Sequence, residues 1–172
     1  MPNATILPFL LEDFGHVNRR LVIMSTDLAC HFAEELARIE PWLSLGYSPE
    51  SLSRYLAATG QERHAMALLV DDTPAACLTV RPNWLRGPLL ELLAVLPEFQ
   101  GVGLGREIIE WLAGQAKRER QGNLWTLCSD FNLAAQTFYL VQGFEQAGSL
   151  PDLICPDKRE LLLRLRLTDR QT

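Results

Sequence analysis

The sequence lacks the features that mark several broad classes of protein. No apolar run reaches about 18 residues, the length that a membrane-spanning helix needs. Lysine and arginine number 16 against 21 aspartates and glutamates, which makes the net charge −5. A protein that binds nucleic acid through its phosphates is expected to be basic. We therefore expect neither a membrane nor a nucleic acid as a partner.

Clusters of metal-ligating residues are also missing. The four cysteines include no CxxC pair, and the three histidines do not stand at the spacing of zinc ligands. We therefore expect no metal, and mostly buried free thiols in a reducing cytoplasm. Residues 1–11 have no basic start of the kind that a signal peptide needs, so we do not expect one.

The composition that remains is typical of one globular domain. Hydrophobic residues make up 48% of the chain and charged residues 22%. A chain of 172 residues is also long enough to bury a sizeable core. We expect residues 1–16 to form an N-terminal extension and residues 17–168 to form a single domain.

Strand and helix patterns alternate along the chain and predict a mixed α/β architecture. Apolar runs predict strands at 19–24, 65–70, 75–81, 89–96, 124–128, 144–150 and 160–167. Helical spacing predicts helices at 27–40, at 48–60, from Gly105 to about Arg120, and at 132–142. The last helix is expected to carry Ala134, Phe138 and Val141 on one stripe. Residues 82–88 are expected to form a loop.

A glycine-rich segment between a predicted strand and a predicted helix carries the most chemical information. In Gln100–Gly105 every second residue from 101 is glycine, so backbone N–H groups can approach an anion at the positive end of the helix. The same residues also suit a tight turn that needs glycine only for positive φ. The spacing does not fit GxGxxG, and Arg106-Glu107 stands where a P-loop has lysine and serine or threonine.

Two motifs resemble hallmarks of the GCN5-related N-acetyltransferase (GNAT) superfamily, which binds acetyl-CoA. The first is Gln100-x-x-Gly103-x-Gly105, and the second is Asn132-x-x-Ala135-x-x-Phe138-Tyr139-x-x-x-Gly143-Phe144. The resemblance covers roughly residues 19–167. Within the superfamily the chain is generally similar to the ribosomal-protein alanine acetyltransferase branch. The resemblance implies a central mixed β-sheet flanked by helices on both faces.

The resemblance also implies acetyl-CoA as the co-substrate, without a metal. Backbone N–H groups of 101–106 are then expected to hold the pyrophosphate, and the strand backbone near Val95 to pair with the pantetheine arm and face the thioester oxygen. Asn132 is similar to a residue that hydrogen-bonds the pantetheine, but it equally suits a helix N-cap. Basic residues at both ends of the helix after Gly105 are expected near this anion. The implied cofactor-binding residues are Leu93, Ala94, Val95, Gln100, Gly101, Val102, Gly103, Leu104, Gly105, Arg106 and Asn132.

Acetyl transfer needs an acid for the leaving thiolate and a base for the amine. The resemblance implies Tyr139 as the acid, although its ring also suits packing beside Phe138. Glu91 is the candidate base, because it is charged in an otherwise apolar strand and shares strand parity with Leu93; burial there would raise its pKa. A salt-bridged glutamate and a water relay are the alternatives. The ribosomal-protein branch has a glutamate on the next strand, where this chain has Leu127.

The acceptor amine is expected to meet Glu40, Trp42, Tyr47 and Trp84, which could receive an ammonium group by charge and cation–π contacts, or could pack as a lid. The predicted function is acetyl-CoA-dependent N-acetylation of a primary amine, on a small molecule or a peptide or protein. We expect direct transfer in a ternary complex, with Cys128 a buried strand residue and not an acetyl carrier. The alternatives are a non-catalytic acyl-CoA-binding sensor or scaffold and, more remotely, a nucleotide binder. A homodimer is also an expectation from the family.

Overall fold

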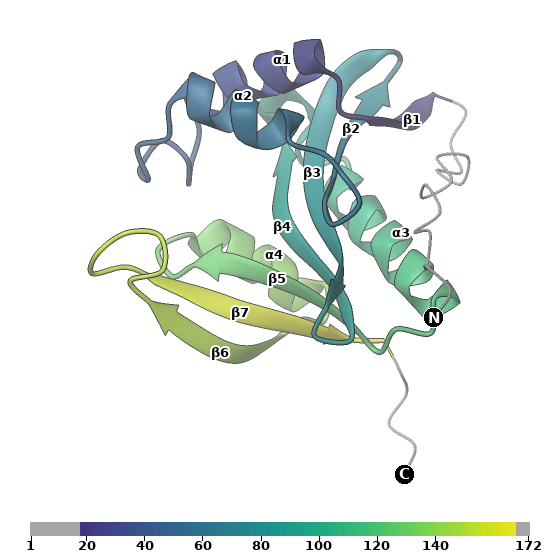
Figure 1. The fold of residues 1–172 in the computed structure, drawn as a ribbon, viewed down its shortest axis with the longest axis vertical. Helices are drawn as coiled ribbons and strands as arrows, with labels where there is room; N and C mark the ends of the chain where they lie inside the picture. The colour runs from purple at the N-terminus through teal and green to yellow at the C-terminus, as the bar shows by residue number, and fades with distance from the viewer. Residues whose placement is uncertain (1–17, 168–172) are drawn as a thin grey trace.

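Seven strands form one mixed sheet across residues 18–167, the part of the chain that the computed structural model describes (Figure 1). The predicted N-terminal extension lies outside these residues. The strands are β1 (Arg19–Ile23), β2 (His64–Val70), β3 (Thr73–Trp84), β4 (Gly87–Val95), β5 (Asn123–Ser129), β6 (Glu145–Pro151) and β7 (Arg159–Arg166). The helices are α1 (Thr26–Leu36), α2 (Pro49–Ala57), α3 (Leu104–Arg118) and α4 (Leu133–Val141), with a short 3-10 turn, η2 (Pro97–Phe99). The predicted order of strands and helices is confirmed.

The strands lie in the order β1-β2-β3-β4-β5-β7-β6, and β4 and β5 form a parallel pair among antiparallel neighbours. The ladder between β4 and β5 consists of Leu89–Trp125 and Leu90–Thr126. Beyond it the strands separate, so β2–β4 stand upright in Figure 1 while β5–β7 lie across them. The sheet is therefore open in its middle at the carboxyl end of β4.

Helices cover both faces of the sheet, as predicted. The buried side of α3 packs with Leu78 and Leu90 in one core cluster. The buried sides of α1 and α2 pack with Cys77 and Leu92 in the other. The central strands β3 and β4 are buried on both faces, which explains their nearly unbroken apolar sequence.

A β-bulge interrupts β4 at Glu91. Thr79 pairs with Leu92 and Val80 pairs with Leu90, which leaves Glu91 as an extra residue. The bulge shifts the alternation of side chains, because Leu90 and Leu93 now belong to the same core cluster. The prediction that Glu91 shares a face with Leu93 is therefore wrong. The Glu91 carboxylate lies instead on the α2 side, where it accepts a hydrogen bond from Tyr55 of that helix.

The predicted loop at 82–88 is also wrong, because β3 continues to Trp84 and β4 begins at Gly87. Leu85 and Arg86 form the turn between them, with φ values of 30° and 61°. This turn is held from β5, where Trp125 Nε1 donates a hydrogen bond to the Leu85 carbonyl at 3.1 Å. A contact between distant segments thus overrides the local proline and glycine signal.

Two helices differ from the predictions in detail. α1 ends at Leu36 rather than at residue 40, because after the C-cap Ala37 the N–H groups of Arg38 and Ile39 bond to carbonyls three residues back. In α4, Tyr139 is the buried residue and Val141 is 77% exposed. The inner side of α4 is therefore formed by Ala135, Phe138 and Tyr139, and the predicted stripe through Ala134 and Val141 is wrong.

Candidate functional site

The candidate site lies where β4 and β5 separate. At the start of the two strands Gly87 lies directly against Asn123, since a Cβ there would stand 2.0 Å from the Asn123 carbonyl oxygen. Past Leu90, β4 keeps its ladder with β3 up to Val95. Its other edge has no strand partner among the described residues. Backbone N–H and C=O groups on that edge are therefore available to a ligand.

One cavity, of about 750 Å³, lies at the end of β4, the start of α3 and the inner side of α4. The glycine-rich segment Gln100–Gly105 lines this cavity. Gly101 and Gly103 have φ values of 78° and 90°, which other residues rarely adopt. Gly105 faces Phe138, whose ring would be 3.1 Å from an added Cβ. The Gln100 side chain ties the segment to β4 by donating to the Val95 carbonyl oxygen at 2.9 Å.

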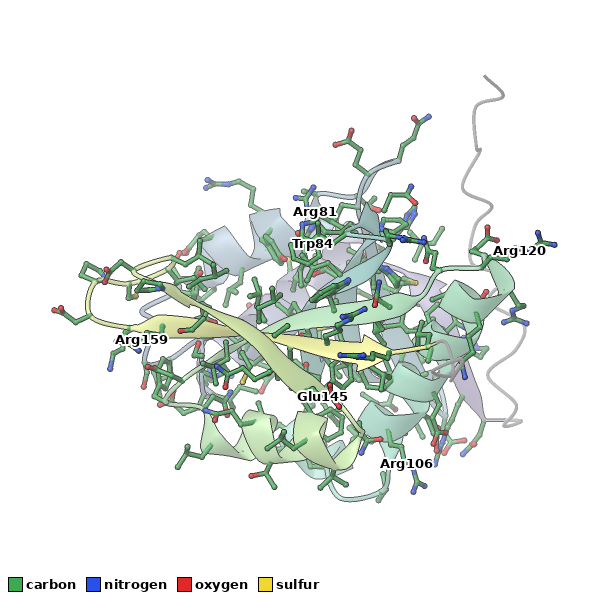
Figure 2. The ribbon with its side chains drawn as sticks, turned by 90° about the horizontal axis from the view of Figure 1, so that it is seen from below. Arg81, Trp84, Arg106, Arg120, Glu145 and Arg159 are labelled. Atoms are coloured by element: carbon green, nitrogen blue, oxygen red, sulfur yellow. The ribbon has the colours of Figure 1, made fainter. Side chains whose placement is uncertain are left out.

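This cavity suits a phosphate anion. Gly103 is the N-cap of α3 and supplies no side-chain hydrogen bond, so the first turn of α3, which lines the cavity, has N–H groups without a side-chain cap. The Arg106 side chain lies beside Gly103 and lines the same cavity. The prediction that basic residues at the end of this helix also lie near the anion is wrong. Figure 2 shows Arg106 and Arg120 at opposite ends of α3, and a 15-residue helix is about 22 Å long.

A second cavity, of about 420 Å³, lies on the other side of the opening. The segment after α1, helix α2, and strands β4, β5 and β7 contribute its walls. Three residues line both cavities, namely Leu93, Ala135 and Tyr139. The two cavities therefore meet at the open edge of β4, where a group held in one can react with a group held in the other.

Tyr139 lies at this junction. Its side chain is 5% exposed, and rings on either side hold it in place, with centroids 5.1 Å away at Phe138 and 5.2 Å away at Phe144. Burial raises the pKa of Tyr139 to about 12, against the lowering effect of its hydrogen bond with Thr126. The phenol therefore keeps its proton at any physiological pH and can donate it in a hydrogen bond.

Glu91 lies at the bulge in β4 and lines the second cavity. Its carboxylate forms salt bridges with two arginines. Arg63 Nε donates to one carboxylate oxygen at 2.8 Å, and Arg81 Nε donates to the other. The hydroxyl of Tyr55 adds a third hydrogen bond at 3.2 Å. Both oxygens are thus engaged, in the salt-bridged arrangement that was the alternative to a free base.

Glu160 is a second carboxylate in this cavity, and the sequence analysis missed it. It is 3% exposed and accepts a hydrogen bond from Ser129 Oγ at 2.8 Å. Burial raises the pKa of Glu160, partly offset by the Ser129 hydrogen bond and reinforced by the charge of Asp130. Glu160 is the second residue of β7, directly after Arg159, and nothing in the local sequence distinguishes it from a solvated residue at a strand end.

The remaining candidate residues divide between those that reach the cavities and those that do not. Trp42 and Tyr47 line the second cavity. Glu40 instead accepts a hydrogen bond from Ser44 Oγ at 2.7 Å within its own turn, and Trp84 stacks edge-on against the Trp125 ring at 5.5 Å. The structure therefore does not bring Glu40 or Trp84 to the acceptor side.

Among the candidates near the cofactor, Asn132 lines the second cavity, and its Oδ1 accepts a hydrogen bond from the Ala135 N–H at 3.1 Å. Its role as N-cap of α4 is thus present in the structure. Ala94 of β4 packs its side chain into the core on the α1–α2 face. Only its backbone can contribute to the open edge.

The Cys128 thiol is buried in the wall of the second cavity. Burial raises its pKa to about 12, so it stays protonated and is a poor nucleophile. Among residues 18–167, no cluster of His, Cys, Asp and Glu side chains could hold a metal ion. Within the same range, no helix is long and apolar enough to cross a membrane.

Comparison with known proteins agrees with this geometry. The family model described as "Acetyltransferase (GNAT) family" matches residues 27–144. The [ribosomal protein bS18]-alanine N-acetyltransferase of Escherichia coli K12 is 27% identical over 124 residues, which cover 72% of this chain and 78% of that protein.

Solved structures show the same fold. The crystal structure of the ribosomal-protein-S18-alanine N-acetyltransferase from Escherichia coli matches with a TM-score of 0.69 at 18% identity, covering 90% of this chain and 98% of that one. A putative acetyltransferase from Salmonella typhimurium, solved with its cofactor acetyl-CoA, matches with a TM-score of 0.61 at 13% identity, covering 90% and 97%.

Proposed function

The chain belongs to the acetyltransferase (GNAT) family and is an acetyl-CoA-dependent N-acetyltransferase; from this premise we propose that it passes the acetyl group directly to a primary amine bound in the second cavity. The observation that carries the proposal is the junction of the two cavities at Leu93 and Tyr139. A donor on one side and an acceptor on the other can react there without a carrier.

The first cavity is the proposed site for acetyl-CoA. The uncapped N–H groups of 101–106 and the helix dipole would hold the pyrophosphate, with Arg106 beside it. The open edge of β4 from Leu93 to Val95 would pair with the pantetheine amides as an added strand does. An N–H on this edge would then donate to the thioester oxygen, where negative charge develops during attack.

Tyr139 is the proposed hydrogen-bond donor to the leaving sulfur. Because its pKa is about 12, Tyr139 is a weaker acid than a thiol, so it stabilises the developing thiolate through a hydrogen bond. Its proton passes to sulfur only as the phenol recovers a proton from the acetylated nitrogen. The donor is thus matched to charge that exists in the transition state and not in the bound thioester. Asn132 orients this residue indirectly, since its side chain caps the helix that carries Tyr139.

The acceptor is proposed to be an amine on an apolar or aromatic body. Apolar side chains dominate the walls of the second cavity, which include Trp42, Leu92, Leu127 and Ile154. A volume of about 420 Å³ accommodates a small molecule or the first residues of a peptide. The bacterial relative acts on an alanine of a ribosomal protein by its name, so a peptide that begins with alanine belongs among the candidates.

A screen of amines with acetyl-CoA tests this function. We expect thiol release with phenethylamine or with an N-terminal alanine peptide bearing apolar residues. Spermidine and an aminoglycoside should react with a kcat/KM at least roughly tenfold lower, because apolar walls cannot solvate their additional charges. Tight acetyl-CoA binding without turnover on any amine would contradict the proposal and favour a sensor.

A further inference from the structure

The second cavity contains one carboxylate, Glu160, that no cation within residues 18–167 neutralises. Glu91 is held by two arginines, whereas none of the residues 18–167 forms an ion pair with Glu160. A carboxylate that is 97% buried without a counterion is costly, since charge is poorly solvated there. Such a group is retained at a cost to stability, which is common for residues that act on a substrate.

We propose that Glu160 is the general base that takes a proton from the acceptor amine; this deepens the proposed function and rests on it. Ser129 pairs with Glu160 across β5 and β7, and Leu127 pairs with Leu162. Residues opposite each other in such a ladder lie on the same face of the sheet. Glu160 therefore stands on the same face as Leu127, and both line the acceptor cavity.

The surroundings of Glu160 suit this role. The titratable groups that interact with Glu160 are Cys128 of β5, Asp130 directly after β5, and Tyr47 of the segment after α1. None of these groups carries a positive charge, so an incoming ammonium would give Glu160 a cationic partner that residues 18–167 do not supply. Glu91 and Tyr139 line the same cavity from β4 and α4. The raised pKa makes Glu160 a stronger base than a solvated glutamate while leaving it ionised at high pH.

Each acetyl transfer from the thioester to the ammonium form of the amine releases one proton. Glu160 accepts one proton from the ammonium group and later returns it to solvent. The freed nitrogen lone pair forms the N–C bond to the thioester carbonyl carbon, and the C–S bond breaks with its electron pair on sulfur. Tyr139 donates a proton to that sulfur and recovers the second proton from nitrogen. The amide keeps the third, so the net products are the N-acetyl amine, CoA thiol and one proton.

Glu160→Gln tests the proposal, because it keeps the shape and the Ser129 contact but cannot accept a proton. We expect kcat at pH 7.5 to fall by about 100-fold or more, with the Kd of acetyl-CoA unchanged within about twofold. The residual rate should rise about tenfold per pH unit up to the pKa of the acceptor, since only free amine then reacts. The matched control is Glu145→Gln on β6 (Figure 2), which removes the same charge from an exposed side chain and should leave kcat unchanged.

Two further measurements separate a base from a structural residue. Leu127→Glu added to Glu160→Gln should restore at least about tenfold in kcat, because the new carboxylate lies on the same face of the same cavity. Glu160→Gln should also raise Tm at pH 8, and the difference should shrink as the pH falls toward 4.5. The sign follows because a raised carboxyl pKa costs the folded state stability as pH rises through it.

The outcomes distinguish a failure of the Glu160 assignment from a failure of the proposed function. Equal kcat for wild type and Glu160→Gln would overturn the assignment of Glu160 alone. A lower Tm at pH 8 together with weaker acetyl-CoA binding would show that Glu160 is structural. A wild-type protein without turnover on the whole amine panel would overturn the proposed function, and Glu160 with it.

Discussion

At the scale of single residues, burial raises the pKa of both Tyr139 and Glu160, which makes one a hydrogen-bond donor and the other a stronger base. It raises the pKa of Tyr139 to about 12, so the phenol keeps its proton at neutral pH and can donate a hydrogen bond to the leaving sulfur. It also raises the pKa of Glu160, which strengthens a carboxylate as a base. Glu91 differs because Arg63 and Arg81 occupy its oxygens. One cavity thus contains two glutamates in unlike environments, which indicates unlike roles.

Tyr139→Phe removes the hydroxyl and leaves the ring packing intact. We expect kcat to fall by about 100-fold, because the leaving sulfur loses its donor. The acetyl-CoA Kd measured by calorimetry should stay within about twofold, since ground-state binding does not use this hydroxyl. Unchanged turnover would show that the residue serves only to pack between Phe138 and Phe144.

At the scale of elements, the site depends on where β4 and β5 touch and where they separate. Gly87 allows their backbones to meet beside Asn123, and the bulge at Glu91 comes directly after their last paired residues. The turn before β4 is held by Trp125 and by the Asn123 side chain, which donates to the Leu85 carbonyl oxygen at 3.4 Å. The contacts at the start of β4 therefore fix its pairing with β5, and the two strands separate only beyond Leu90.

Gly87→Ala tests this contact. Its Cβ would stand 2.0 Å from a backbone oxygen that cannot move without displacing β5. We expect a loss of about 1–3 kcal/mol in the free energy of unfolding, measured by urea denaturation, as for other overpacked sites. A matched control is Gly114→Ala inside α3, where nothing lies within 4 Å of the added Cβ. That change should stabilise by about 0.5–1 kcal/mol through helix propensity, and equal effects of both changes would contradict this explanation.

At the scale of the whole molecule, the two cavities reach the opening from opposite sides and meet at Leu93, Ala135 and Tyr139. Both substrates can therefore be bound at once. The Cys128 thiol in the wall has a pKa of about 12, so it is not available as an acetyl carrier at neutral pH. The architecture thus favours direct transfer over a covalent relay.

Initial-rate kinetics check this order of events. Double-reciprocal plots at several fixed acceptor concentrations should intersect, as expected for a ternary complex. Parallel lines, together with acetyl-CoA cleavage in the absence of acceptor and an acetylated protein by mass spectrometry, would contradict direct transfer.

Much of the fold, and the glycine-rich segment that lines the first cavity, could be predicted from the sequence because their signals are local. Gly101 and Gly103 have positive φ next to a helix start, and Asn132 caps the helix that carries Tyr139 a few residues later. The order of strands and helices follows from hydrophobic periodicity in the same way. Each of these features depends on residues that are close together in the chain.

The acceptor side was decided by the tertiary structure. The bulge places Glu91 on the α2 side of β4. A hydrogen bond from Trp125 holds a hairpin turn where the sequence predicts a loop at 82–88. Trp84 packs against Trp125 and not in the cavity. Ser129 and Glu160 are 31 residues apart and meet because β7 pairs with β5. The register of such pairs is set by which faces can be buried together across the whole sheet, a free-energy balance that no single stretch of sequence contains.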